Sequence, residues 1–101
     1  LRVALRYSAS AVRVKAAWAL GMLRSKEAIP DLLLTLRDGH RRVRQQSAWA
    51  LMQIEEPEVI PALEMALQME EDPWVQGDLR RAAEYLRQFQ GESDLTELRF
   101  R

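Results

Sequence analysis

The chain has 101 residues, which is the length of one ordinary domain. Its hydrophobic fraction of 48% excludes a disordered protein, and its 15 basic and 15 acidic residues cancel, so no overall charge attracts nucleic acid or anionic membranes. The absence of cysteine excludes disulfides and fits a reducing compartment, and we therefore expect a cytoplasmic protein. No apolar run approaches the roughly 20 residues of a membrane span, so no membrane partner is expected.

One segment of the sequence occurs twice. Residues 12–24 read VRVKAAWALGMLR and residues 43–55 read VRQQSAWALMQIE, at an offset of 31 residues. The same offset relates further identical pairs: Ile29/Ile60, Pro30/Pro61, Leu32/Leu63 and Leu36/Leu67. A fixed period of this size is typical of stacked repeats, and the spacing within each copy predicts that the repeats are helical.

The first ten residues continue the period backward, because Leu1 and Leu5 stand 31 residues before Leu32 and Leu36. We therefore predict that residues 1–10 are the end of a truncated repeat and that the chain is a piece of a longer solenoid. Such an incomplete edge is expected to expose Leu1 and Leu5.

Helices of a first kind are predicted at 27–38 and 57–69, where apolar residues recur at i, i+3, i+4 and i+7. Ser25 is placed to cap the first of them. Pro57 suits the first position of the second, where its missing N–H would be unpaired anyway.

Helices of a second kind are predicted at 11–24, 41–54 and 74–89, again from the spacing of their apolar residues. Gly39 is expected to form a left-handed C-cap in the turn before the second of them. Asp72 is expected to cap the third.

The third copy has drifted, because Val75 follows Val43 by 32 residues rather than 31. We expect Gly91 to end its helix. Residues 90–101 are then predicted to form a C-terminal tail that holds at most a short helix.

Two motifs recur in these helices. They are formed by Pro30, Leu32, Leu33, Leu36, Arg37 and Asp38, and by Val43, Arg44, Ala48, Ala50 and Leu51 with the earlier copy Val12, Arg13, Ala16, Ala17, Ala19, Leu20 and Gly21. Over about residues 1–89 the pattern resembles the HEAT-like repeat family in its short, phycobilisome-lyase-type form. The resemblance implies a right-handed α–α superhelix of about two full helical pairs plus partial terminal repeats. It also implies that the first helix of each pair is convex and the second concave.

In this family a ladder of Asp and Arg residues, six positions apart, joins the repeats. The resemblance places it at Asp38 and Arg44, with Arg13 as the matching residue of the preceding copy. Tyr7 replaces the Asp before Arg13, and Gln76 replaces the Arg of the later copy. We therefore expect the ladder to be interrupted at both ends.

Trp18 and Trp49 occupy the variable position of an A-x-A-L motif, which the family's geometry would turn toward the concave groove. Partly exposed tryptophan is a common interface anchor, and Trp74 is expected to extend the row. The alternative is that the indoles fill space between helices, or in Trp74 pack on the turn. The residues predicted around the row are Lys15, Met22, Gln45, Gln46, Gln53 and Asp78.

One local run of basic residues stands between two predicted helices: Arg37, His40, Arg41, Arg42 and Arg44. Its functional interpretation is a phosphate or acidic contact through Arg41 and Arg42. The alternative is a solvated corner in which Arg44 is already paired with Asp38.

An apolar row also recurs at the period of 31 on the predicted convex helices, at Val3, Leu34 and Met65. It is a candidate second contact surface or homodimer seam. The alternative is partial burial beneath the neighbouring repeat. Self-association through this row, or through the truncated N-terminal edge, is thus a hypothesis.

No catalytic residues, metal or cofactor are expected. His40 is the only histidine and cysteine is absent, which excludes the common zinc sets, and no Ser/His/Asp set or Gly-rich phosphate loop stands out. The favoured function is a protein–protein interaction scaffold that binds a protein or peptide on its concave face. The alternatives implied by the resemblance are a tRNA- or DNA-binding HEAT appendage of a larger enzyme, and a bilin-lyase-like subunit.

Overall fold

The computed structural model describes residues 2–7 and 9–99. The side chains that it describes end at Gln90 and leave out those of Val3, Arg6 and Tyr7. In chain order the α-helices are α1 (Arg2–Tyr7), α2 (Ser10–Met22), α3 (Ile29–Thr35), α4 (Arg41–Ile54), α5 (Ile60–Met69) and α6 (Pro73–Arg99). Short 3₁₀ turns, η1 (Lys26–Ala28) and η2 (Pro57–Val59), lead into α3 and α5.

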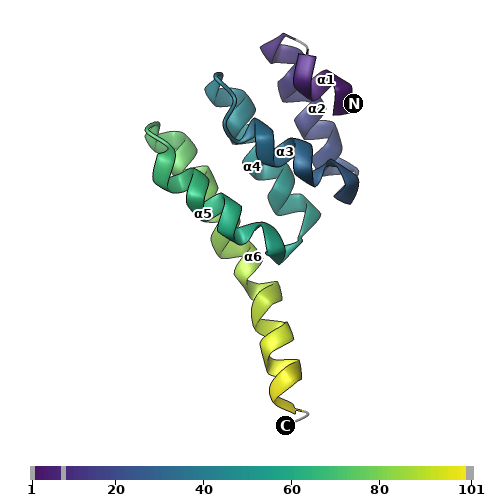
Figure 1. Cartoon of the computed structure of the whole chain (residues 1–101), viewed down its shortest axis with the longest axis vertical. Helices are drawn as coiled ribbons and strands as arrows, with labels where there is room; N and C mark the ends of the chain where they lie inside the picture. Colours follow the sequence, from purple (N-terminus) through teal and green to yellow (C-terminus); the bar gives the residue numbers. More distant parts are fainter. Residues whose placement is uncertain (1, 8, 100–101) are drawn as a thin grey trace.

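The helices stack as successive pairs, with α1 on α2, α3 on α4, and α5 on α6. The second helices also pack side by side, α2 against α4 and α4 against α6, so that they form one continuous layer (Figure 1). Each pair thereby covers the apolar stripe of the next, which a single pair cannot do for itself. The predicted all-α solenoid is confirmed.

The core of the stack follows the repeat period. Ala17 and Ala48 hold equivalent positions and are fully buried, which lets the second helices approach closely. Leu20 and Leu51 fill the space beside them. The core also includes Leu32, Leu36, Val43, Ile60, Leu63, Val75, Leu79 and Leu86. Small and branched side chains thus alternate across the layer, as close packing requires.

The first helix closes the stack more completely than expected. Leu5 is only 1% exposed and belongs to the same core as α2 and α3, so its predicted exposure is wrong. α1 is held there by its contacts with both of these helices. Leu1 lies outside the described residues.

The helix ends differ from the predicted ones in detail. The helix expected at 27–38 is divided into η1 and α3, and Ser25 makes no side-chain capping bond. α3 gives way to 3₁₀-type bonds, in which the N–H of Arg37 and of Asp38 reach back only three residues. A proline in the first turn of α3 and of α5 is tolerated because the first N–H groups of a helix lack intrahelical partners.

The left-handed turns also lie elsewhere. No glycine among the described residues has a positive φ, so the predicted left-handed cap at Gly39 is wrong. Arg24 and Glu55, which follow the second helices, adopt φ values of 50° and 61° instead. α4 begins with a side-chain cap from His40, whose Nδ1 accepts the N–H of Arg42.

The last helix starts where it was expected and ends much later. The Asp72 carboxylate accepts the N–H groups of Trp74 and Val75, at 2.9 and 3.4 Å, so the predicted cap is present. The helix then runs unbroken through Gly91 to Arg99, and the prediction that it ends at Gly91 is wrong. A helical glycine costs only about 1 kcal/mol, which weakens a helix without ending it. Among the described helices, α6 included, none is long and apolar enough to cross a membrane.

Candidate functional site

The layer of second helices presents one continuous surface to solvent. On each helix it consists of the positions spaced i, i+4, i+7 and i+11 that point away from the core. The 31-residue offset aligns α2 with α4, and an offset of 32 aligns α4 with α6. We call this surface the second-helix face; it comprises Ala11, Lys15, Trp18 and Met22 of α2, Arg42, Gln46, Trp49 and Gln53 of α4, and Trp74, Asp78, Arg81 and Tyr85 of α6. None of these residues is buried.

The two tryptophans of the repeated motif have different surroundings. Trp18 is 50% exposed, whereas Trp49 is partly buried against the core. A Cβ atom on Gly21 would lie 2.8 Å from Cζ3 of Trp49, so the Trp49 indole lies over the glycine of the preceding helix. The described chain has no second helix before α2 to cover Trp18 in the same way. Trp49 therefore fills space between helices, and Trp18 points outward.

Trp74 does not extend this row, and that prediction is wrong. The one-residue insertion places Arg81 in register with Trp18 and Trp49, and it places Trp74 in register with Arg42. Arg81 and Trp49 line the same small hollow at the junction of α4 and α6. Trp74 is 70% exposed on the first turn of α6, so it is not packed on that turn.

The charge of the second-helix face differs from that of the whole chain. It carries three basic side chains and one acidic one, a net charge of +2 on a chain whose net charge is zero. The acidic residue, Asp78, accepts hydrogen bonds from Gln45 Nε2 and Arg81 Nη1, both at 2.9 Å. Within the described part of the chain, neither Lys15 nor Arg42 has a carboxylate partner. The face also holds all three tryptophans of the chain.

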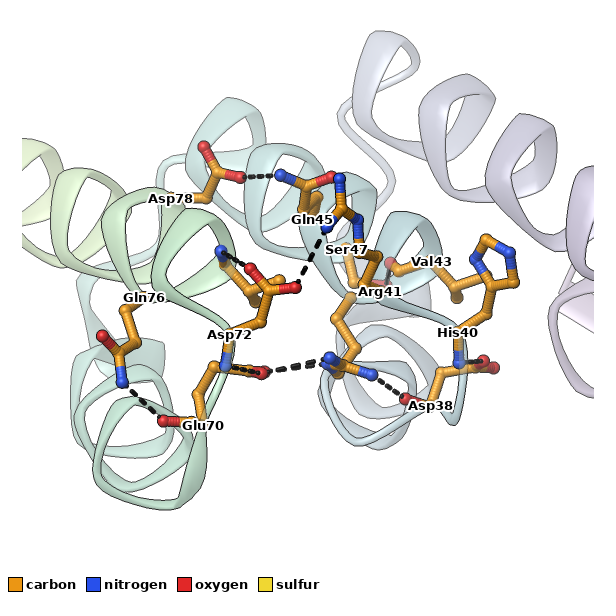
Figure 2. A network of polar contacts seen from close by, with 12 residues as sticks. Asp38, His40, Arg41, Val43, Gln45, Ser47, Glu70, Asp72, Gln76 and Asp78 are labelled. Atoms are coloured by element: carbon orange, nitrogen blue, oxygen red, sulfur yellow. Dashed lines mark hydrogen bonds and ion pairs between the residues drawn. The ribbon is translucent and has the colours of Figure 1, made fainter.

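A ladder of ion pairs links the successive pairs of helices, and Figure 2 shows the polar network around Asp38, Glu70 and Asp72 of which one rung is part. Arg13 binds the Asp38 carboxylate through two hydrogen bonds of 2.8 and 3.0 Å. Arg44 binds the Glu70 carboxylate in the same way, at 2.8 and 3.1 Å. Each rung therefore runs from the arginine of one repeat to the acid of the next, and it is a bidentate pair of the strong kind.

The ladder differs from the expected one in its partners. Arg44 was expected to pair with the Asp38 carboxylate, but it donates only to the main-chain oxygen of that residue, at 2.8 Å. Gln76 makes the equivalent bond to the main-chain oxygen of Glu70, at 2.7 Å. Glu70 follows Asp38 by 32 residues, so the insertion seen at Val75 was the signal that could have identified it.

Two acids of this region, Asp38 and Asp72, have pKa values below the ordinary one. Burial alone would raise the pKa of Asp38, but hydrogen bonds from Arg13 and from the His40 N–H, together with the Arg13 charge, bring it below its ordinary value. The pKa of Asp72 is likewise lowered, because the N–H groups of Trp74 and Val75 and the charge of Arg41 outweigh the effect of burial. Both carboxylates are therefore anions at neutral pH.

The basic corner is largely committed to the fold. Arg41 pairs with Asp72 at 3.4 Å, and an Arg37 N–H donates to the sulfur of Met69. His40 caps α4 and Arg44 forms a rung of the ladder. Arg42 is the residue of this corner that has its side chain left for a ligand.

A separate apolar row lies on α3 and α5. Leu34 and Met65 are 60% and 62% exposed, so the alternative of partial burial does not hold for them, and the side chain of Val3 lies outside the described residues. At the far end of the second-helix face the Tyr85 hydroxyl donates to Glu55, which raises the pKa of Tyr85. Tyr85 was not identified from the sequence as a residue of this face.

The described side chains contain no cluster of three or more His, Cys, Asp or Glu suited to a metal ion.

Two crystal structures of epoxyqueuosine reductase have a fold similar to that of this chain. A crystal structure of epoxyqueuosine reductase with a tRNA-Tyr epoxyqueuosine-modified tRNA stem loop matches 75% of this chain with a TM-score of 0.71 and 27% identity. A crystal structure of selenomethionine-labelled epoxyqueuosine reductase matches 74% of it with a TM-score of 0.70 and 28% identity. The match covers only 20% of each of those chains, so this chain spans about a fifth of their length. A search of curated proteins found no match.

The family of the chain follows from its repeats. The family model described as HEAT repeats matches residues 1–84, which is most of the chain. The stacked helical pairs and the motifs quoted above agree with that match. The chain belongs to the HEAT-repeat family.

Proposed function

We propose that this interaction scaffold binds RNA on its second-helix face, as a non-catalytic part of a longer RNA-modifying enzyme. The observation that carries the proposal is that this face combines a net charge of +2 with all three tryptophans, although the chain as a whole is neutral. Cations contact phosphates, and exposed aromatic rings stack on unpaired bases. The likeness to an enzyme whose structure includes a tRNA stem loop supports the same function.

The sequence favoured a protein partner over nucleic acid, because the net charge of the whole chain is zero. The proposed RNA partner therefore differs from that expectation. Much of the acidic charge, however, lies in ion pairs of the ladder and beside helix starts. Lys15 and Arg42, which have no carboxylate partner among the described side chains, stand on the second-helix face.

The test measures binding of a fluorescently labelled RNA stem loop by anisotropy at several salt concentrations. Lys15→Glu with Arg42→Glu is compared with Arg37→Glu with Arg80→Glu, which makes the same change in net charge at exposed residues outside the face. We expect the first pair to weaken binding at least about tenfold more than the second. It should also reduce the slope of log Kd against log salt by about 1.5 to 2, since two phosphate contacts are lost. Equal effects of the two pairs, or binding that is insensitive to salt, would contradict RNA binding by this face.

A second candidate is a protein or peptide partner at the α2 end of the face. The observation that favours it is an apolar hollow beside Trp18, lined by Ala4, Val12, Lys15, Ala16, Trp18 and Ala19. Exposed tryptophan next to apolar surface is typical of protein interface anchors. This candidate predicts binding that is lost with Trp18→Ala, is kept with Arg42→Glu, and changes little with salt.

A further inference from the structure

Trp74 is held rigidly at an exposed place. Its N–H and that of Val75 are bound by the Asp72 carboxylate, and Pro73 starts the helix with a restricted φ. Val75, the next residue, is fully buried and anchors the first turn of α6 to the core. The indole that this turn carries is nevertheless 70% exposed. It is therefore an aromatic surface presented to solvent on a fixed support.

The fold does not require an aromatic residue at this position. The equivalent residue is Ala11 on α2 and Arg42 on α4, and both are exposed. The three repeats thus show that a small, a charged and an aromatic residue are all compatible with the same stacking. A role in packing does not explain Trp74.

Arg42 is the cation at the position of α4 that is equivalent to Trp74 on α6. Its own backbone is fixed by the bond from its N–H to His40, and its side chain has no carboxylate partner among the described residues. Its neighbour Arg41 is paired with Asp72, and Arg44 is paired with Glu70. Packed helices lie roughly 8–10 Å apart, so equivalent positions on α4 and α6 are separated by about the span of one nucleotide from base to phosphate.

We propose that Trp74 and Arg42 together hold one unpaired nucleotide of the RNA, with its base stacked on the indole and its phosphate on the guanidinium. This inference rests on the proposed function and specifies which part of the RNA the α6 end of the face contacts. The polar surroundings favour a nucleotide over a protein anchor. Asp72 binds the Trp74 N–H and Arg41 pairs with Asp72, whereas anchoring tryptophans of protein interfaces sit in well-packed, desolvated pockets. The apolar hollow lies instead at the opposite end, beside Trp18.

The first experiment uses the chain with Trp18→Phe and Trp49→Phe, in which Trp74 is the only tryptophan. Its fluorescence is followed while two RNAs are added: a stem closed by an unpaired loop, and the same stem as a blunt duplex. We expect the loop RNA to quench Trp74 and the duplex to leave it nearly unchanged. Circular dichroism checks that the variant is folded.

The second experiment does not depend on those substitutions. Trp74→Ala is expected to weaken loop binding by roughly 5- to 100-fold, as measured by anisotropy, with duplex binding unchanged. Trp74→Phe should restore most of the loss, and Met65→Ala is the control at a large exposed side chain outside the second-helix face. If loop RNA binds while Trp74→Ala changes nothing and Trp74 is not quenched, the nucleotide site is wrong although the proposed function stands. If neither RNA binds the wild-type chain, both are wrong.

Discussion

The helices α2 and α4 carry the same A-W-A-L motif, but the tryptophan is partly buried in α4 and half exposed in α2. The motif buries its first alanine and its leucine in both copies, with Ala17 and Ala48 fully buried. Trp49 is partly buried because the preceding helix offers Gly21 beneath its ring, whereas Trp18 is half exposed. The surroundings of a repeated residue therefore depend on the helix that it contacts, and its own sequence does not decide them.

The largest expected effect comes from removing the space under Trp49. Gly21→Leu places a Cβ 2.8 Å from both Cα of Ala50 and Cζ3 of Trp49, and the backbone atom cannot move without separating α2 from α4. We expect a loss of about 3 kcal/mol or more in the free energy of unfolding, measured by urea denaturation. The matched control is Gly77→Ala, since nothing lies within 4 Å of a Cβ there, and helix propensity should stabilise it by up to about 1 kcal/mol. Equal effects of the two changes would show that the close approach at Gly21 is unimportant.

The tryptophans themselves give the next largest effect. Trp49→Ala should cost about 2 kcal/mol, because it opens a gap between α4 and α2. Trp18→Ala should cost less, about 1 kcal/mol, because half of that side chain is already in water. Urea denaturation of both variants measures the difference, and a larger loss at Trp18 would reverse the assignment of structural and available residues.

The third prediction compares the partly buried Arg44–Glu70 ion pair with the more exposed Arg41–Asp72 ion pair. Glu70→Gln leaves Arg44, whose side chain is only 18% exposed, without its carboxylate, and should cost about 1–2 kcal/mol. The matched control is Arg41→Ala, which removes the more exposed pair with Asp72 and should cost less than about 1 kcal/mol. Thermal unfolding in low and high salt measures both. An equal and strongly salt-dependent loss would show that the Arg44 rung behaves as an ordinary surface pair.

The smallest effect is the pH dependence of the Arg13–Asp38 rung. Because the pKa of Asp38 is lower in the folded chain than its unfolded value of about 3.9, the rung stabilises the fold above that value. This stability is lost as the pH falls through the folded pKa. Wild type should therefore lose more stability than Asp38→Asn between pH 5 and pH 3, as measured by thermal melts. Parallel curves for the two proteins would mean that Asp38 does not contribute in this way.

Much of the fold could be predicted from the sequence, because it depends on the spacing of apolar residues within and between the repeats. The period, the apolar stripes and the Asp72 cap are properties of nearby residues, and the structure shows them where they were expected. The errors at Gly39 and Gly91 have a common cause. Glycine permits a left-handed turn or a helix end, but neighbouring interactions decide whether one occurs.

Only part of the candidate site could be predicted from the sequence. Most residues of the second-helix face were identified, but Trp74 was assigned to the wrong row and Arg42 to a separate corner. The error at Trp74 comes from one inserted residue, which shifts the register of α6 against α4. The offset of 32 was recognised at Val75, but it was not carried over to Trp74 and Glu70, which it makes equivalent to Arg42 and Asp38.

The sequence by itself determined that the chain is a stack of helical pairs, because the positions that must be apolar recur at one period. Only the tertiary structure decided which tryptophan is open, which acid closes each rung and which cations remain free. Those outcomes depend on contacts between residues about 30 positions apart on different helices. Their partners are set by how the helices stack, so identical motifs acquired different surroundings.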